Sequence, residues 1–244
     1  MLGVITGSGF YRLAALHDAD EQVVDTPYGT TKLTTGAWNG GRQVVFIPRH
    51  GVDHSVPPHV INYRANLWAL RDAGVTGIVA TAVSGAISTD LAPGDFVVID
   101  DFIDFTTGRQ ATFFDAAGEL THTDMSDPYD TALRSVLVEA AKTVDVPVVV
   151  GGTYCATNGP RFESKAEITM MGRLGGDLVG MTGCPEVVLA NELNIPYASL
   201  GVISNMAAGL GERDFTIDEI MAVLADAAAP LERLIGAVVE QVEV

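Results

Sequence analysis

The sequence contains little positive charge. Its 244 residues include 31 Asp and Glu but only 14 Lys and Arg, which gives a formal net charge of -17. Nucleic acids and anionic membranes attract proteins mainly through Lys and Arg, so we expect neither as a partner. A small anionic ligand is compatible with this composition, but a few local donors would have to bind it, because long-range attraction is absent.

Cysteine and long apolar runs are also scarce. The two cysteines, Cys155 and Cys184, have neither CxxC nor metal-ligand spacing. A chain of this length needs no disulfide framework, so we expect two reduced, buried thiols and no metal site. No apolar run reaches the roughly 18 residues of a membrane span, and the N-terminus lacks the pattern of a signal peptide. These absences predict a cytoplasmic protein.

What the sequence does contain is an alternation of short β-branched runs and longer helical patterns. Several of the runs are nearly continuous in apolar residues, as in strands that are covered on both faces. Strands are expected at Leu2–Thr6, Gln43–Pro48, Gly77–Val83, Phe96–Phe102, Val146–Thr153, Asp177–Met181 and Tyr197–Ile203. Helices are expected at His59–Ala73, from Asp127-Pro128 through Lys142, after the capping-box pairs Ser164/Glu167 and Thr216/Glu219, and from Pro185. This order predicts an α/β fold, with a mixed central β-sheet flanked by helices, in a single domain over residues 1–244.

Two motifs at strand ends contain groups that suit an oxyanion. Gly7-Ser8-Gly9 follows the first strand, and its amides and hydroxyl can donate to an anion. Arg12 breaks the dinucleotide pattern GxGxxG and no Walker motif is present, so a plain tight turn remains an alternative. Arg49-His50-Gly51 follows the second strand, and a forked guanidinium beside an imidazole suits phosphate. A surface ion pair is the alternative interpretation there.

Four further strand ends contain groups for a heterocycle or an anion. They are Thr81-Ala82-Val83-Ser84-Gly85, Gly159-Pro160-Arg161-Phe162-Glu163, Met181-Thr182 and Ser204-Asn205. An aromatic ring can stack on a base, a carboxylate can accept from a ring N–H, and an amide can both donate and accept. Each residue alone is equally compatible with a place in the core or at a helix cap. Ligands of α/β sheets bind beyond the carboxyl ends of strands, so it is the convergence of six such ends that predicts a site.

The same motifs, in chain order, resemble one protein family. The set comprises GSG at 7–9, RHG at 49–51, NYRAN at 62–66, PGD at 93–95, GPRF at 159–162, and MT with PEV at 181–187. It is similar to the purine nucleoside phosphorylase / methylthioadenosine phosphorylase family, especially the bacterial S-methyl-5'-thioinosine phosphorylase branch. The resemblance covers nearly the whole chain. It implies a nucleoside phosphorylase fold, a homotrimer with sites near subunit interfaces, and inorganic phosphate as co-substrate without a cofactor.

The resemblance also implies roles for individual residues. Phosphate would be bound by Ser8, Arg49, His50, Ala82 and Thr182, with Thr81 beside them. Phe162 and Met181 would line the base and the ribose. His122 matches a residue that the family contributes from the neighbouring subunit toward the 5' end of the sugar. His50, Glu163 and Asn205 would be catalytic, the last two by stabilising the departing purine.

Departures from the family pattern bear on the substrate. Members that cleave methylthioadenosine have Asp at the positions of Asn205 and Ala207 and Ser at that of Glu163, whereas 6-oxopurine members have Glu and Asn at 163 and 205. A Glu163 carboxylate can accept from N1–H of a 6-oxopurine but would repel the N1 lone pair of adenine. A buried polar group without a hydrogen-bond partner costs about 1–3 kcal/mol, which is enough to discriminate between a 6-oxopurine and adenine. Ile217 stands where ordinary nucleoside phosphorylases place a His for the 5'-hydroxyl, which favours a methylthio group.

The sequence therefore predicts phosphorolysis of a 6-oxopurine (thio)nucleoside such as 5'-methylthioinosine, inosine or guanosine, through an oxocarbenium-like transition state. Three alternatives remain open. The first is an adenine-releasing methylthioadenosine phosphorylase, if Glu163 points away from the base. The second is a nucleosidase that uses water, and the third is a non-catalytic nucleoside-binding protein.

Overall fold

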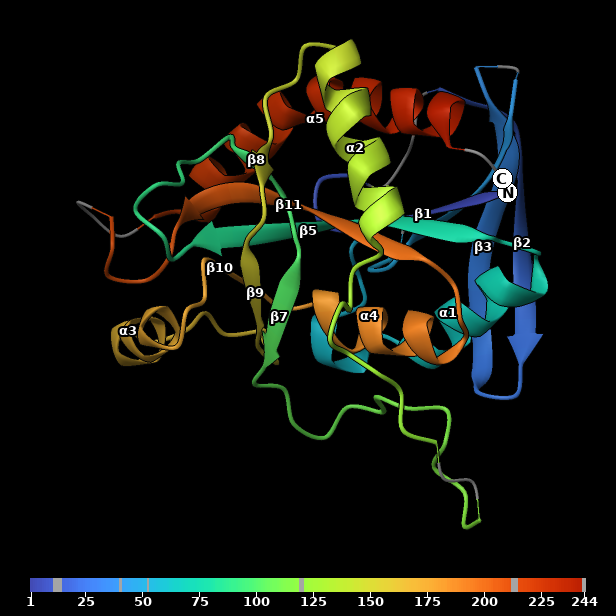
Figure 1. The fold of residues 1–244 in the computed structure, drawn as a ribbon, viewed down its shortest axis with the longest axis horizontal. Coiled ribbons are helices and arrows are strands. Elements are labelled where there is room, and N and C mark those ends of the chain that lie inside the picture. Colours follow the sequence, from blue (N-terminus) through green and yellow to red (C-terminus); the bar gives the residue numbers. More distant parts are fainter. Residues whose placement is uncertain (11–14, 40, 52, 119–120, 212–214, 243–244) are drawn as a thin grey trace.

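The computed structural model describes residues 1–10, 15–39, 41–51, 53–118, 121–211 and 215–242, and these residues form one mixed sheet covered by helices (Figure 1). The strands are β1 (Leu2–Thr6), β2 (Leu16–Thr26), β3 (Gly29–Trp38), β4 (Gln43–Pro48), β5 (Gly77–Ala86), β6 (Phe96–Val98), β7 (Asp101–Asp104), β8 (Val149–Val150), β9 (Thr153–Ala156), β10 (Leu178–Gly180) and β11 (Tyr197–Met206). The α/β fold with a mixed sheet is therefore confirmed.

The sheet branches at β5, a buried strand of 10 residues. The main path runs β2-β3-β4-β1-β5-β10-β9-β7, while β11 pairs with β5 and leads to β6 and β8. Strands β4, β1, β5 and β11 are mutually parallel, and β10 is antiparallel to β5. The carboxyl ends of the four parallel strands therefore meet at one edge, where a ligand site is expected.

Helices cover both faces of the sheet, with α2 and α5 above it and α1 and α4 below it in the view of Figure 1. Their bounds are α1 (Tyr63–Asp72), α2 (Thr131–Thr143), α3 (Lys165–Arg173), α4 (Gly183–Glu192) and α5 (Ile217–Gln241), with a 3-10 turn at Pro58–Val60. Strand β4 shows why both faces are covered. Its Val44 and Phe46 belong to the core cluster that includes residues of α5, whereas Val45 and Ile47 belong to the cluster that includes residues of α1. Side chains of a strand alternate between faces, so an apolar run such as β4 needs cover on both.

Several predicted element boundaries are wrong. The β2–β3 hairpin was not predicted, because β2 (LHDADEQVVDT) is mostly exposed and polar and lacks an apolar alternation. The predicted strand Val146–Thr153 is divided between β8 and β9, because Gly151 has a φ of +90°, which breaks the ladder. Phe96–Phe102 is likewise divided between β6 and β7. Helix α2 begins at Thr131 rather than at Pro128, because the Asp130 side chain caps it by accepting from the Leu133 amide at 2.7 Å.

Other local predictions are confirmed. Capping boxes are present at Ser164/Glu167 and Thr216/Glu219, and Cys155 and Cys184 are free, buried thiols. In the described part of the chain, no helix is long and apolar enough to cross a membrane.

Candidate active site

A cavity of about 280 Å³ lies at the carboxyl ends of the parallel strands. The predicted residues that line it are Ser8, His50, Phe162, Glu163, Met181, Thr182, Asn205, Ala207 and Ile217. Residues from the two ends of the chain and from its middle therefore meet around one space, as the convergence of strand ends predicted. Arg49, Thr81, Ala82 and His122 are the predicted site residues that do not line it.

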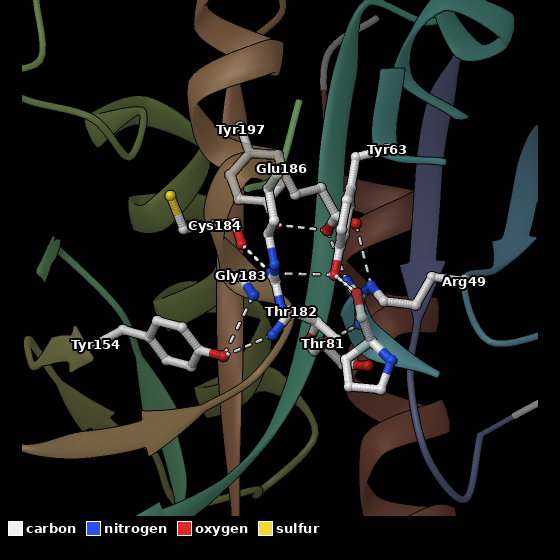
Figure 2. A network of polar contacts seen from close by, with 11 residues as sticks. Arg49, Tyr63, Thr81, Tyr154, Thr182, Gly183, Cys184, Glu186 and Tyr197 are labelled. Atoms are coloured by element: carbon white, nitrogen blue, oxygen red, sulfur yellow. Dashed lines mark hydrogen bonds and ion pairs between the residues drawn. The ribbon is translucent and has the colours of Figure 1, made fainter. Parts of the chain in front are cut away.

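Part of the cavity lining consists of small donors. Ser8 follows β1 and His50 follows β4, while Thr182 occupies the N-cap position of α4 without a capping hydrogen bond from its side chain. The backbone approaches closely here, since a Cβ on Gly7 would lie 3.0 Å from Nη1 of Arg49. The backbone amides of Thr182 and Gly183 donate to the Tyr154 hydroxyl at 3.1 and 3.2 Å, which fixes the start of α4 (Figure 2). Hydroxyls and a glycine turn suit an oxyanion.

Arg49 differs from the expectation of a phosphate ligand exposed in the cavity. It lies behind the cavity wall, where its Nε and Nη2 donate to the two carboxylate oxygens of Glu186 at 3.0 and 2.6 Å. Its Nη1 donates to the Thr81 carbonyl at 2.5 Å, and Tyr197 donates to Glu186 at 2.8 Å (Figure 2). Both charged side chains have 0% exposure. Burial lowers the Arg49 pKa, but the charge and hydrogen bonds of Glu186 outweigh it and the pKa is raised.

Two further residues predicted at the phosphate end are buried. Thr81 and Ala82 are 0% and 1% exposed, and β5 instead exposes Val83, Ser84 and Gly85 to the cavity. The Thr81 hydroxyl has no hydrogen-bond partner among the described residues. Thr81 therefore contributes to this region through its carbonyl, which binds Arg49.

His50 is held in one tautomer. Its Nδ1 lies 2.8 Å from the Val56 carbonyl, and a carbonyl can only accept, so Nδ1 carries the proton. Burial lowers the His50 pKa to about 4, and the charges of Arg49 and His54 act in the same direction, against the effect of the Val56 hydrogen bond. The imidazole is therefore neutral near pH 7, and Nε2 carries a lone pair.

The cavity lining also includes a carboxylate and an amide. The Thr157 hydroxyl donates to Oε1 of Glu163 at 2.6 Å, which leaves Oε2 available to a ligand. Thr157 was not predicted, because a lone Thr after a strand carries no distinctive signal. Its position one residue after β9 places it beside the loop that carries Glu163.

Asn205 reaches the cavity through an irregularity in β11. The register with β5 shifts between Ile203 and Asn205, and this bulge changes the direction of the side chains that follow. The Asn205 Nδ2 donates to the Met206 carbonyl at 2.8 Å, and Oδ1 accepts from Ser204 at 2.7 Å. These partners fix the amide orientation and leave one N–H of Nδ2 for a ligand.

Much of the remaining cavity lining is apolar. Phe162 and Phe215 pack edge to face with centroids 4.9 Å apart, and Met181, Ile217 and Met221 extend the surface. Phe162, Ile217 and Met221 remain 44%, 59% and 45% exposed. Apolar side chains this exposed at a cavity mouth are available to a ligand or a neighbouring chain.

Comparison with known proteins decides the family. Residues 1–240 match the phosphorylase superfamily. The chain belongs to this superfamily. The 6-oxopurine nucleoside phosphorylase of Pyrococcus furiosus is 41% identical over 244 residues, covering 98% of this chain and 91% of the relative. A probable S-methyl-5'-thioinosine phosphorylase of Methanothermobacter thermautotrophicus is 43% identical over 244 residues, with coverages of 100% and 85%.

Solved structures show the same fold. Methylthioadenosine phosphorylase from Schistosoma mansoni in complex with adenine superposes with a TM-score of 0.92 at 32% identity, covering 98% of this chain and 90% of that chain. The resemblance to the phosphorylase family that the sequence indicated is therefore confirmed.

In this phosphorylase, Arg109 is a site residue that the sequence did not reveal. Its guanidinium donates to the carbonyls of Met181 at 2.7 Å and Cys184 at 2.6 Å, at the start of α4. It also donates to the carbonyls of Thr157 and Asn158 at 3.2 and 3.1 Å, in the loop after β9. Arg109 thus connects the loop that carries Glu163 to the loop that carries Thr182. Four backbone carbonyls that meet at one side chain leave no pattern in the sequence.

His122 lies away from the cavity of its own chain. It is exposed in the long connection between β7 and α2, which extends away from the sheet (Figure 1). The base of this connection is fixed by Arg64, which binds Asp115, and by Glu192, which accepts from the Phe113 amide at 2.6 Å. Among the described residues, no cluster of three or more His, Cys, Asp or Glu side chains could hold a metal.

Proposed function

We propose that this chain is a nucleoside phosphorylase that transfers the (thio)ribosyl group of a 6-oxopurine nucleoside to inorganic phosphate. The observation that carries the proposal is one cavity that is lined both by Ser8, His50 and Thr182 and by Glu163 and Asn205. The names of the relatives, 6-oxopurine nucleoside phosphorylase and probable S-methyl-5'-thioinosine phosphorylase, agree with it.

The polar groups at the base end match a 6-oxopurine. Oε2 of Glu163 can accept from N1–H while Oε1 is held by Thr157. The remaining N–H of Asn205 can donate to O6 or N7 of the purine, where negative charge builds as the base leaves. Adenine presents a lone pair at N1, which the Glu163 carboxylate would repel. Glu163 and Asn205 therefore act as catalytic residues that stabilise the leaving group, and Ala207 adds no carboxylate at its own position in the cavity lining.

At the other end, phosphate would be held beneath the sugar by Ser8, His50 and Thr182. Arg49 lies behind the wall beside Gly7 with its side chain fully buried, so it would act on the anion through its positive charge. Phosphate held there is both the nucleophile and the counter-charge for an oxocarbenium-like sugar, which combines proximity with preorganised electrostatics. Thr81 and Ala82 would support this end from behind the wall.

The apolar wall supports a methylthio group at the 5' position. Ile217 and Met221 offer no donor or acceptor to a 5'-hydroxyl, whereas a thioether is compatible with them. Phe162 and Met181 would contact the base and the ribose. The exposed His122 would approach the 5' end of a site in a neighbouring copy, within a homotrimer.

A base-release assay with 5'-methylthioinosine, 5'-methylthioadenosine, inosine and guanosine, with and without phosphate, tests the proposal. We expect phosphate-dependent release of hypoxanthine, fastest from methylthioinosine. Faster release of adenine would favour a methylthioadenosine phosphorylase, the activity named for the Schistosoma mansoni structure. Release without phosphate would indicate a nucleosidase, and binding without release a non-catalytic protein.

Asn205→Asp is expected to move the preference toward aminopurines. Asp presents acceptors where the amide donates, so the ratio of hypoxanthine to adenine release should fall by about tenfold or more. Competition between the two thio-nucleosides measures this ratio. Asn191→Asp is the matched control, because Asn191 also donates to backbone carbonyls, those of Pro128 and Val187, but lies outside the cavity. An unchanged ratio in Asn205→Asp would count against the assignment.

Thr157→Val is expected to lower kcat/KM for inosine or methylthioinosine by about tenfold. The substitution removes the hydroxyl that orients Glu163, and a hydrogen bond to a charged group contributes about 1.5–3 kcal/mol. Steady-state kinetics measure the loss. The control is Thr169→Val on α3, whose hydroxyl donates to the Lys165 carbonyl and is exposed. Equal kinetics for the two variants would show that Thr157 does not position Glu163.

A further inference from the structure

We propose that the anion in this site donates a hydrogen bond from its own hydroxyl group to Nε2 of His50. The site therefore selects hydrogen phosphate over fully deprotonated anions of the same shape. The inference rests on the proposed function only for the location of the anion. It assigns a specificity-determining role to His50 Nε2, as an acceptor for the P–OH group. Hydrogen arsenate shares this hydroxyl, whereas sulfate and selenate lack it near neutral pH.

The tautomer of His50 is the first step. Nδ1 lies 2.8 Å from the Val56 carbonyl, which has lone pairs but no proton, so Nδ1 must be the donor. The neutral ring then has no proton on Nε2. Nε2 has no hydrogen-bond partner among the described residues, and the imidazole lines the cavity. The Cδ2 atom next to Nε2 would lie 4.0 Å from a Cβ on Gly7, so this side of the ring faces the glycine turn.

The surroundings of His50 oppose a second proton on the ring. The residues that act on it electrostatically are Arg49, a buried cation, and His54, whose ring centroid is 4.8 Å away. Burial is the largest influence, and together these effects lower the His50 pKa to about 4. Glu186 is paired with Arg49, so the guanidinium compensates its negative charge.

The remaining groups at this end are donors. The hydroxyls of Ser8 and Thr182 line the cavity and can each donate to an anion, and the buried Arg49 behind the wall adds a positive charge. An anion with one P–OH group and three unprotonated oxygens therefore satisfies every partner. A sulfate ion has four acceptor oxygens, and one of them would face the lone pair of Nε2. A site built to bind a hydroxyl rejects an analogue that lacks it, because its own polar group is left unpaired.

Anion binding to the free protein tests the inference by isothermal titration calorimetry near pH 7.5. Phosphate and sulfate form one size-matched pair, and arsenate and selenate form another. We expect the hydroxyl-bearing member of each pair to bind roughly ten- to a hundredfold more tightly. Sulfate binding should also tighten as the pH falls from 7.5 to 5.5, because the complex takes up a proton on Nε2. Equal affinities within both pairs, with no such pH dependence, would overturn the inference.

A variant separates the hydrogen bond from the shape of the site. In His50→Gln the side-chain amide can rotate to donate a hydrogen bond. The ratio of the phosphate affinity to the sulfate affinity should therefore fall toward one, and the pH dependence of sulfate binding should disappear. A purely structural role would weaken both anions in parallel and leave their ratio unchanged. His17→Gln, on the exposed β2, is the control and should retain the wild-type ratio. The calorimetry needs no turnover, so base release tests the proposed function separately.

Discussion

Glu186→Gln is expected to lower the free energy of unfolding by about 3–5 kcal/mol, the usual effect of breaking a buried ion pair by removing one partner. Glu186 and Arg49 are both fully buried, and the bidentate bonds of 3.0 and 2.6 Å are the charge compensation of the guanidinium. Gln removes the negative charge and brings an NH2 group toward the guanidinium donors. Tyr197 also loses its charged acceptor. Urea unfolding followed by circular dichroism measures the difference.

Glu139→Gln is the matched control for this prediction. It makes the same chemical change in a pair with Lys142 whose side chains are 64% and 66% exposed, so solvent screening should keep the effect below about 1 kcal/mol. The double variant Arg49→Met, Glu186→Leu should be less destabilised than Glu186→Gln, because it leaves no unpaired charge in the core. Similar losses in Glu186→Gln and Glu139→Gln would contradict the buried-pair interpretation.

Arg109→Met is expected to lower kcat/KM for phosphorolysis by a hundredfold or more. The substitution leaves the carbonyls of Met181 and Cys184 without their donor and separates the Thr182 loop from the Glu163 loop. A misplacement of about 1 Å between reacting groups can cost 100-fold in rate. The measurement is steady-state kinetics with both phosphate and nucleoside varied, alongside thermal unfolding. Both KM values should rise, because Arg109 supports both ends of the cavity.

Arg109→Lys should lie between the wild type and Arg109→Met. Lysine retains the charge but lacks the planar fork that reaches several carbonyls at once. Arg161→Met is the control, since Arg161 lies two residues from Glu163 but is exposed, and it binds Glu167 on α3 and the neighbouring Phe162 carbonyl without reaching the Thr182 loop. Equal losses of kcat/KM in Arg161→Met and Arg109→Met would show that the connection between the two loops is not the reason for the loss in Arg109→Met.

The sequence predicted those structural elements whose bounds depend on residues close to one another in the chain. Strand β1 was predicted at its observed bounds, Leu2–Thr6, and β4 at Gln43–Pro48, because a short apolar run covered on both faces is visible in the chain itself. The capping boxes before α3 and α5 are likewise local, since each joins residues three apart. The hairpin of β2 was missed because an exposed edge strand needs no apolar pattern.

What the sequence determined by itself is the chemistry available at the strand ends. Ser8, His50, Glu163, Thr182 and Asn205 were all predicted and all line one cavity, because parallel strands bring their carboxyl ends to one edge. Residue type and place in an α/β alternation were sufficient for that.

Only the tertiary structure decided which of these groups face a ligand and which support it. Arg49 and Glu186 are 137 residues apart in the chain, and no local pattern predicts that Glu186 accepts from two donors of Arg49. The β11 bulge that directs Asn205, the tautomer of His50 and the carbonyls gathered by Arg109 depend equally on distant partners. The physical reason is that hydrogen bonds and charge pairing act over a few ångströms in space, and proximity in space is set by the fold rather than by sequence separation.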